Sequence, residues 1–142
     1  MAERGGRLLG LDLGERRIGL ALGDPTGLLA GALMVLPSRV RARDVAAVRE
    51  IAAREGAVAA VVGVPVNMDG SRGPQAEKSH RFGAALEAAG LPVIYWDERL
   101  TTVEAQRYLR DGGMSREKRR QTIDAAAAQI LLQSYLDYRR RQ

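Results

Sequence analysis

Residues 7–36, RLLGLDLGERRIGLALGDPTGLLAGALMVL, decide the fold class. They divide into three apolar runs, at 7–13, 17–22 and 28–36, and glycine-containing turns separate the runs. Short apolar runs with glycine between them are typical of strands that pair antiparallel with their neighbours in the chain. This stretch therefore predicts a three-stranded antiparallel meander.

The pattern of the chain changes after the meander. Apolar residues at helical spacing predict helices, and short continuous apolar runs predict strands that are covered on both faces. In chain order the expected elements are helix 43–55, strand 58–64, helix 75–89, strand 92–96, helix 101–110 and a last helix from 115 to about 138. A meander followed by right-handed crossovers builds one sheet. We predict an α/β, ribonuclease H-like fold: a mixed five-stranded sheet, three antiparallel strands then parallel crossovers, with helices on both faces.

Length and composition indicate one globular domain over residues 1–142. The absence of cysteine excludes disulfides, cysteine nucleophiles and zinc–thiolate sites. No stretch reaches the roughly 20 apolar residues of a membrane helix, and no signal peptide is recognisable, so a cytoplasmic location is expected. Lys and Arg number 22 against 17 Asp and Glu, a net charge of +5. Such a basic domain favours nucleic acid as a partner, although a genome rich in arginine codons would give the same composition.

Asp12 is an acidic residue in an unusual place, because it lies inside the apolar run 7–13. In a strand, Gly10 and Gly14 share its face and leave room for another group to approach. A carboxylate in an apolar run is costly unless it is paired or binds a metal. The alternative is an aspartate that simply starts the turn at Gly14.

Two further acids, Asp97 and Glu98, directly follow the predicted strand 92–96. Ligands of open α/β sheets gather at the carboxyl ends of the strands, so these side chains are placed to bind one. The alternative is an interaction with the positive end of the next helix. Because Thr101 and Glu104 already fit a capping box at that helix, two more acids are not needed there.

Asp124 lies on the predicted last helix, in a row whose other members are apolar. Ala128, Leu131 and Tyr135 follow it at i+4, i+7 and i+11, so this row is expected to face the sheet. A lone acid in such a row indicates a functional role. The alternative is an acid that interacts with the helix dipole or with Arg120 one turn earlier.

These acids are expected to converge at one edge of the sheet. The first strand, the last strand and the last helix would bring together Asp12, one or both of Asp97 and Glu98, and Asp124. Carboxylate oxygens suit hard cations such as Mg²⁺ or Mn²⁺. Two such ions can activate a water and stabilise the leaving oxygen of a phosphodiester. The single histidine, His80, makes a Ser-His-Asp triad an unattractive alternative.

Cations accompany each acid, as a polyanionic substrate would require. They are Arg16 and Arg17 after Asp12, Arg99 after Glu98, and Arg116, Lys118, Arg119 and Arg120 before Asp124. Asn67, in the polar turn after strand 58–64, is a further candidate contact at the same edge. The alternative for the cations is salt bridging on a solvated surface. Only 4% of the residues are aromatic, so no base-stacking platform is expected.

Four segments together match one known family in order and spacing. They are LLGLDLGERRIGLALGDP, VVGVPVNMDGS with Phe82 downstream, DERLTTVEA and DAAAAQILLQSYLD. On these segments nearly the whole chain resembles the YqgF/RuvX family, whose members are similar to RuvC and are known as Holliday junction resolvases and as pre-16S rRNA nucleases. The resemblance implies a cytoplasmic bacterial protein of ribosome maturation. Gly23 stands where the family usually has serine, which affects only a local contact.

The resemblance also implies that Asp12, Glu98 and Asp124 are the metal-binding catalytic acids, with Asp97 as a reserve ligand. We therefore expect a hydrolase, a metal-dependent endonuclease with two ions of Mg²⁺ or Mn²⁺, in which Asp12 bridges both ions. The phosphates would be positioned by Arg17, Arg99 and Arg119. The preferred substrate is the end of pre-16S rRNA, with ribosomal precursor particles as possible partners.

Three other functions stay open at this point. One is a Holliday junction resolvase that acts on four-way DNA in recombination and repair, because the residues themselves do not separate RNA from DNA. Another is a non-catalytic RNA-binding assembly factor whose acids hold structural Mg²⁺. The last is an ATP site of the sugar-kinase or actin type, which would need a second domain that this length does not provide. The sequence leaves open whether the chain is a monomer or a homodimer.

Overall fold

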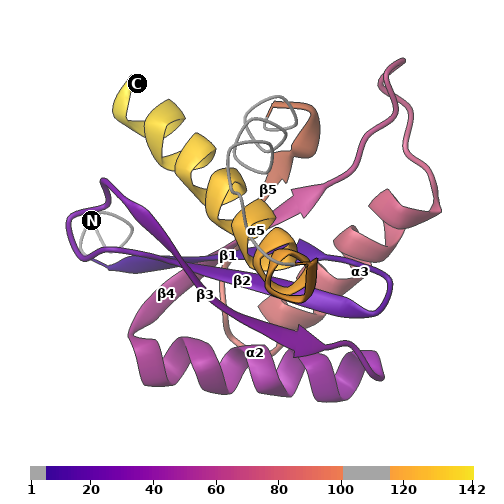
Figure 1. Cartoon of the computed structure of the whole chain (residues 1–142), viewed down its shortest axis with the longest axis horizontal. Coiled ribbons are helices and arrows are strands. Elements are labelled where there is room, and N and C mark those ends of the chain that lie inside the picture. Colours follow the sequence, from indigo (N-terminus) through magenta and orange to yellow (C-terminus); the bar gives the residue numbers. More distant parts are fainter. Residues whose placement is uncertain (1–5, 101–115) are drawn as a thin grey trace.

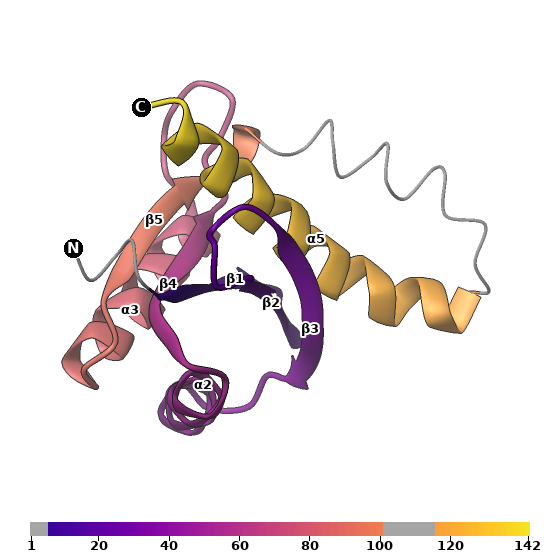
Figure 2. The same ribbon diagram turned by 90° about the vertical axis from the view of Figure 1, so that its left-hand side faces the viewer.

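The computed structural model describes residues 6–100 and 116–142, with the backbone alone for 116–124. In this part of the chain a five-stranded sheet lies between one long helix and a pair of helices (Figure 1; Figure 2). The strands are β1 (Arg7–Leu13), β2 (Arg17–Gly23), β3 (Ala30–Pro37), β4 (Ala57–Val64) and β5 (Val93–Asp97). The helices are α2 (Arg41–Glu55), α3 (Pro74–Ala88) and α5 (Arg116–Arg140), and a 3-10 turn spans Glu98–Leu100. The helix expected at 101–110 lies outside the described residues.

The sheet has the order β3-β2-β1-β4-β5. β1, β2 and β3 pair antiparallel, whereas β4 joins β1 and β5 joins β4 in parallel. α5 covers one face, and α2 and α3 cover the other (Figure 2). The predicted fold class is thereby confirmed. Because β1, β4 and β5 run in parallel, their carboxyl ends meet at the same edge of the sheet.

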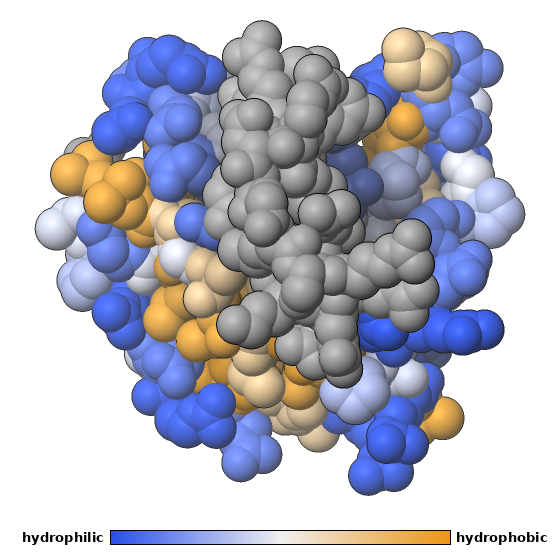
Figure 3. All heavy atoms as spheres, in the orientation of Figure 1, coloured by the Kyte–Doolittle hydropathy of each residue, from blue (hydrophilic) through white to orange (hydrophobic). Residues whose placement is uncertain are grey.

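The boundaries of the described elements fall within two residues of those expected. The third strand begins at Ala30 and not at Leu28. The carboxylate of Asp24 accepts hydrogen bonds from the N–H groups of Leu28 at 3.0 Å and Leu29 at 3.4 Å. These bonds hold both leucines in the turn, where they remain exposed. In the space-filling view, apolar residues form a band along the edge strand β3, bordered by hydrophilic residues (Figure 3).

β4 contributes buried residues to a hydrophobic core on each face of the sheet. Ala60 and Val62 belong to the cluster beneath α2 and α3, whereas Ala59 and Val61 belong to the cluster beneath α5. The continuous apolar sequence of β4 is therefore that of a strand buried on both sides, as predicted.

Among the described residues, no helix is both long and apolar enough to span a bilayer.

The start of α3 is tied to the end of β1. The Gln75 side-chain amide donates a hydrogen bond to the Leu13 carbonyl at 3.0 Å, and the Lys78 ammonium donates to the Gly14 carbonyl at 3.3 Å. Pro74 occupies the first turn of α3, where a missing N–H costs little. These contacts hold α3 against the edge of the sheet that contains the carboxyl end of β1.

Gly10 allows α5 to approach β1 closely. A Cβ atom at this position would lie 2.8 Å from Leu132 Cβ and 3.1 Å from the Ala128 carbonyl oxygen. The space beside Gly10, expected from the sequence to admit another group, is therefore filled by the protein's own helix. Ala128 and Leu131 of the predicted apolar row are buried against the sheet, and Tyr135 packs beside them.

Gly10→Ala is expected to destabilise the protein by about 1–3 kcal/mol, because the added methyl group overpacks the interface between β1 and α5. Urea unfolding measures the change. Gly31→Ala in β3 is the matched control, since a Cβ there meets nothing within 4 Å. Equal unfolding free energies for the two variants would contradict this account of the interface.

Candidate active site

Asp12 and Glu98, far apart in the sequence, come together at the carboxyl edge of the sheet. Asp12 is the penultimate residue of β1, and Glu98 begins the turn that follows β5. Leu11 and Leu13 belong to the cluster beneath α2 and α3, so Asp12 faces the α5 side, as the alternation along the strand predicted. The Glu98 and Asp12 side chains share a hydrogen bond. The structure thus brings together two of the three predicted catalytic acids.

Gly63 makes the contact between these acids possible. It lies on β4, the strand between β1 and β5, and pairs with Trp96 of β5. A Cβ atom at this position would lie 2.6 Å from Glu98 Oε1 and would collide with Leu131. The absence of a side chain at Gly63 therefore lets the Glu98 carboxyl lie across β4 towards Asp12.

The environment of Glu98 changes its acidity strongly. Burial, followed by the charge and the hydrogen bond of Asp12 and the charge of Asp97, raises the pKa of Glu98 from 4.5 to about 8. Two neighbouring carboxyls that both ionise repel each other, so a metal-free pair retains a proton near neutral pH. A divalent cation would take the place of that proton. Since both groups offer only oxygen, the pair fits Mg²⁺ or Mn²⁺ better than a softer metal.

The third predicted acid, Asp124, lies in α5, but its side chain is outside the described part of the structure. The backbone of α5 runs antiparallel to β1, because Ala128 lies at Gly10 whereas Leu136 reaches the Gly23 position next to Leu8. Position 124 precedes Ala128 by one turn and is therefore on the Asp12 side of Gly10. Among the described side chains, no group of three or more acids, histidines or cysteines could hold a metal ion.

Asp97 and Glu98 are adjacent but have opposite environments. Both carboxylate oxygens of Asp97 accept hydrogen bonds from the Arg99 guanidinium, the shortest at 2.6 Å from Nη2 to Oδ2. These bonds hold the pKa of Asp97 below its usual range. Arg99 Nη1 also donates to the Asn67 carbonyl at 3.4 Å. Asp97, the reserve ligand, thus supports a cation beside the acidic pair.

The remaining predicted cations fall into two groups. Arg16 is exposed in the turn between β1 and β2, and Arg17 is the exposed first residue of β2. A hydrogen bond from the Gly14 N–H to the Arg17 carbonyl at 2.8 Å closes the turn. The second group lies on the first turns of α5, with side chains outside the described residues: Arg116, Lys118, Arg119 and Arg120. Their contact with phosphate stays a prediction.

An aromatic cluster beside the site was not expected from the composition. The Trp96 ring lies 5.5 Å from Tyr135 and 5.2 Å from Tyr138, and the Arg139 guanidinium lies 5.8 Å from the Tyr135 ring centroid. The signal in the sequence was the i, i+3 spacing of the two tyrosines on the last helix, opposite a tryptophan at a strand end. Overall composition cannot reveal such grouping, because it ignores position.

A family model described as "RuvX: Holliday junction resolvase" matches residues 6–138. The "Putative pre-16S rRNA nuclease" of Moorella thermoacetica is 50% identical over 132 residues, which cover 92% of this chain and 94% of the relative. The protein of the same name from Symbiobacterium thermophilum is 48% identical over 134 residues, 94% of this chain and 93% of the relative.

Solved structures share the fold at low sequence identity. Thermus thermophilus RuvC in complex with a Holliday junction superposes with a TM-score of 0.60 at 19% identity, over 95% of this chain and 96% of that chain. The fowlpox virus resolvase with junction DNA gives a TM-score of 0.54 at 13% identity, over 93% and 97% of the two chains. Both likenesses concern the arrangement of strands and helices.

Proposed function

The chain belongs to the RuvX family, and from this premise we propose that it is a divalent-metal-dependent endonuclease that processes the ends of pre-16S rRNA. The observation that carries the proposal is the contact between Asp12 and Glu98, two carboxyls held together at the carboxyl ends of β1 and β5. Holding like charges together is unfavourable without a cation. The name that the curated relatives carry supports rRNA as the substrate.

In this proposal Asp12, Glu98 and Asp124 would hold Mg²⁺ or Mn²⁺, with Asp97 in reserve. Two bound ions would supply a nucleophilic water and neutralise charge on the leaving oxygen of the phosphodiester. The chain's own contribution is to align the acids. β1 and β5 present Asp12 and Glu98 on either side of Gly63, and the low pKa of Asp97 keeps a full charge opposite Arg99. Arg99 is then a fixed cation for a substrate phosphate.

The proposal includes nucleic acid as the partner, within ribosomal precursor particles in the cytoplasm. Cleavage of four-way DNA is the second candidate, because the matching family model is described as a Holliday junction resolvase. The acidic pair suits both substrates equally, because both reactions hydrolyse a phosphodiester.

The test compares two labelled substrates, a 16S precursor end and a four-way DNA junction, each with Mg²⁺ or Mn²⁺. We expect the RNA to be cut and the junction to stay intact at equal protein concentration. Cleavage of the junction alone would make the second candidate correct. Binding of RNA without cleavage of either substrate would instead support a non-catalytic assembly factor.

A further inference from the structure

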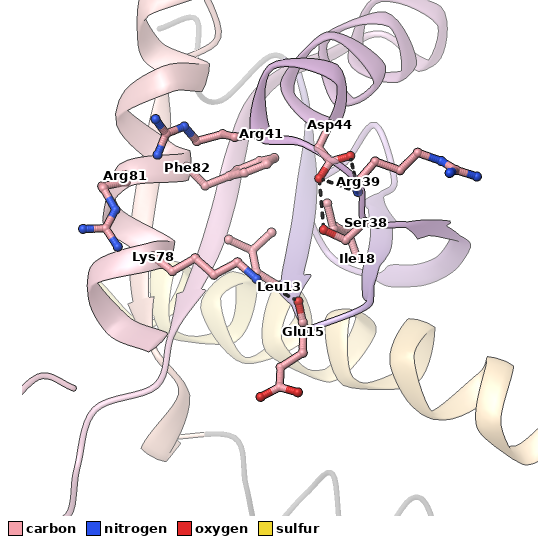
Figure 4. A pocket seen from close by; sticks show the side chains of 11 residues that line it. Leu13, Glu15, Ile18, Ser38, Arg39, Arg41, Asp44, Lys78, Arg81 and Phe82 are labelled. Atoms are coloured by element: carbon pink, nitrogen blue, oxygen red, sulfur yellow. Dashed lines mark hydrogen bonds between the residues drawn. The ribbon is translucent and has the colours of Figure 1, made fainter. Parts of the chain in front are cut away.

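A cavity lies at the same end of β1 as Asp12 but on the other face of the sheet (Figure 4). Leu13, which directly follows Asp12, contributes to its floor together with Ile18 and Phe82, and all three are buried. The cavity has a volume of about 230 Å³. A water molecule occupies roughly 30 Å³ in the liquid, so the cavity has room for a larger group.

Four cationic residues line the cavity, but the Arg39 guanidinium extends away from Phe82, which leaves three cations beside the apolar floor (Figure 4). Arg41 begins α2, and Lys78 and Arg81 lie on successive turns at the start of α3. Figure 4 shows the guanidinium groups of Arg41 and Arg81 extending past Phe82 on the same side of the cavity. Within the described residues, neither arginine forms an ion pair, whereas the Lys78 ammonium donates a hydrogen bond to the Gly14 carbonyl.

The acids at the cavity do not neutralise these cations. The buried carboxylate of Asp44 accepts hydrogen bonds from the Ser38 hydroxyl at 3.0 Å and from the Arg39 N–H at 3.0 and 3.1 Å. These bonds stabilise the segment that leads into α2. Glu15 is exposed, and its carboxylate points away from Arg41 and Arg81 in Figure 4. The cavity therefore presents positive charge over an apolar floor.

We propose that this cavity binds a backbone phosphate of the substrate nucleic acid at a position away from the cleaved bond. The inference rests on the proposed function and adds a binding subsite to it. Asp12 and Leu13 are consecutive residues on opposite faces of the sheet. A nucleic-acid strand that passes over the turn after β1 would therefore meet both the acidic pair and the cavity. Arginine binds phosphate oxygens bidentately, and both Arg41 and Arg81 are exposed where they line the cavity.

The experiment measures RNA affinity as a function of salt for a double variant, Arg41→Gln with Arg81→Gln. The Asp12→Asn background prevents consumption of the labelled 16S precursor RNA. Each lost phosphate contact lowers the slope of log affinity against log salt by about 0.7–0.9, so we expect a total fall of about 1.5 and roughly tenfold weaker binding near 0.1 M salt. Arg54→Gln is the matched control, an exposed arginine at the other end of α2 that pairs with Glu55. It should retain the wild-type slope.

Several results would overturn this inference. An unchanged slope in the double variant, an equal change in Arg54→Gln, or a lack of RNA binding by the parent protein would each do so. Titration with AMP separates a backbone phosphate from a free nucleotide. Loss of AMP binding at unchanged RNA affinity would show a nucleotide site instead. Failure of the proposed function is a separate observation, because it appears as absent cleavage by the wild-type protein even if the salt slope changes as expected.

Discussion

Asp12→Asn is expected to lower the rate of RNA cleavage by roughly 10³-fold or more, while RNA affinity stays the same or rises. Asparagine keeps the shape of the side chain but replaces a charged metal ligand with a neutral amide, and loss of one well-placed electrostatic group already costs about 10²–10³ in rate. Binding should persist because the cations at Arg99 and the turn after β1 are unchanged. Single-turnover cleavage and RNA titration measure the two quantities separately.

Asp137→Asn provides the matched control for this experiment. Asp137 lies on α5 and pairs with Arg140 at 2.7 Å, in the last turns of the helix. The control should cleave at the wild-type rate. Wild-type cleavage by Asp12→Asn would refute the assignment of Asp12 to the catalytic site, and parallel losses in both variants would indicate a general loss of structure.

The stability of the metal-free protein is expected to fall as pH rises from about 5 to 9, and Glu98→Gln should remove much of this fall. The pKa of Glu98 is about 8 in the folded chain, above its ordinary 4.5. Folding is therefore favoured by the bound proton. This contribution is complete below pH 4.5 and is lost as pH rises through about 8. Thermal unfolding with a chelator, at closely spaced pH values, measures the change in Tm.

Glu98→Gln is a suitable comparison because the amide stays neutral at every pH and has nearly the same volume. Added Mg²⁺ should raise the Tm of the wild-type protein most at high pH, where both carboxylates are charged, and should raise the variant's Tm less. Identical pH profiles for the two proteins would show that Glu98 is not the group that retains the proton.

The sequence was informative wherever a local pattern reports burial. Alternation along 7–13 placed Asp12 on the opposite face from Leu11 and Leu13, and the structure confirms this face. The continuous apolar run at 58–64 identified β4 as a strand with a core on both sides. The spacing of the last helix assigned Ala128 and Leu131 to the sheet. Periods of two and 3.6 residues are properties of the backbone, so such conclusions need no tertiary information.

The local sequence pattern could not distinguish Asp97 from Glu98, because both acids follow the same apolar run. Only the resemblance to a known family favoured Glu98 as the ligand. Their roles separate because Asp97 meets the Arg99 guanidinium, whereas Glu98 crosses Gly63 to reach Asp12. The neighbour that determines the pKa of Glu98 is Asp12 on another strand, and the neighbour that determines the pKa of Asp97 is Arg99 in the following turn. The opposite pKa directions of the two carboxyls are therefore a property of the assembled sheet.

Gly10 and the basic cavity also separate what the sequence determines from what depends on the tertiary structure. The sequence alone determined the order of strands and helices, the face on which Asp12 lies and the excess of positive charge, because these follow from composition and local periodicity. Only the tertiary structure decided that α5 fills the space at Gly10 and that Arg41 and Arg81, from different helices, share one cavity. Both outcomes depend on how closely separate elements pack, and that distance is set by side chains far apart in the chain.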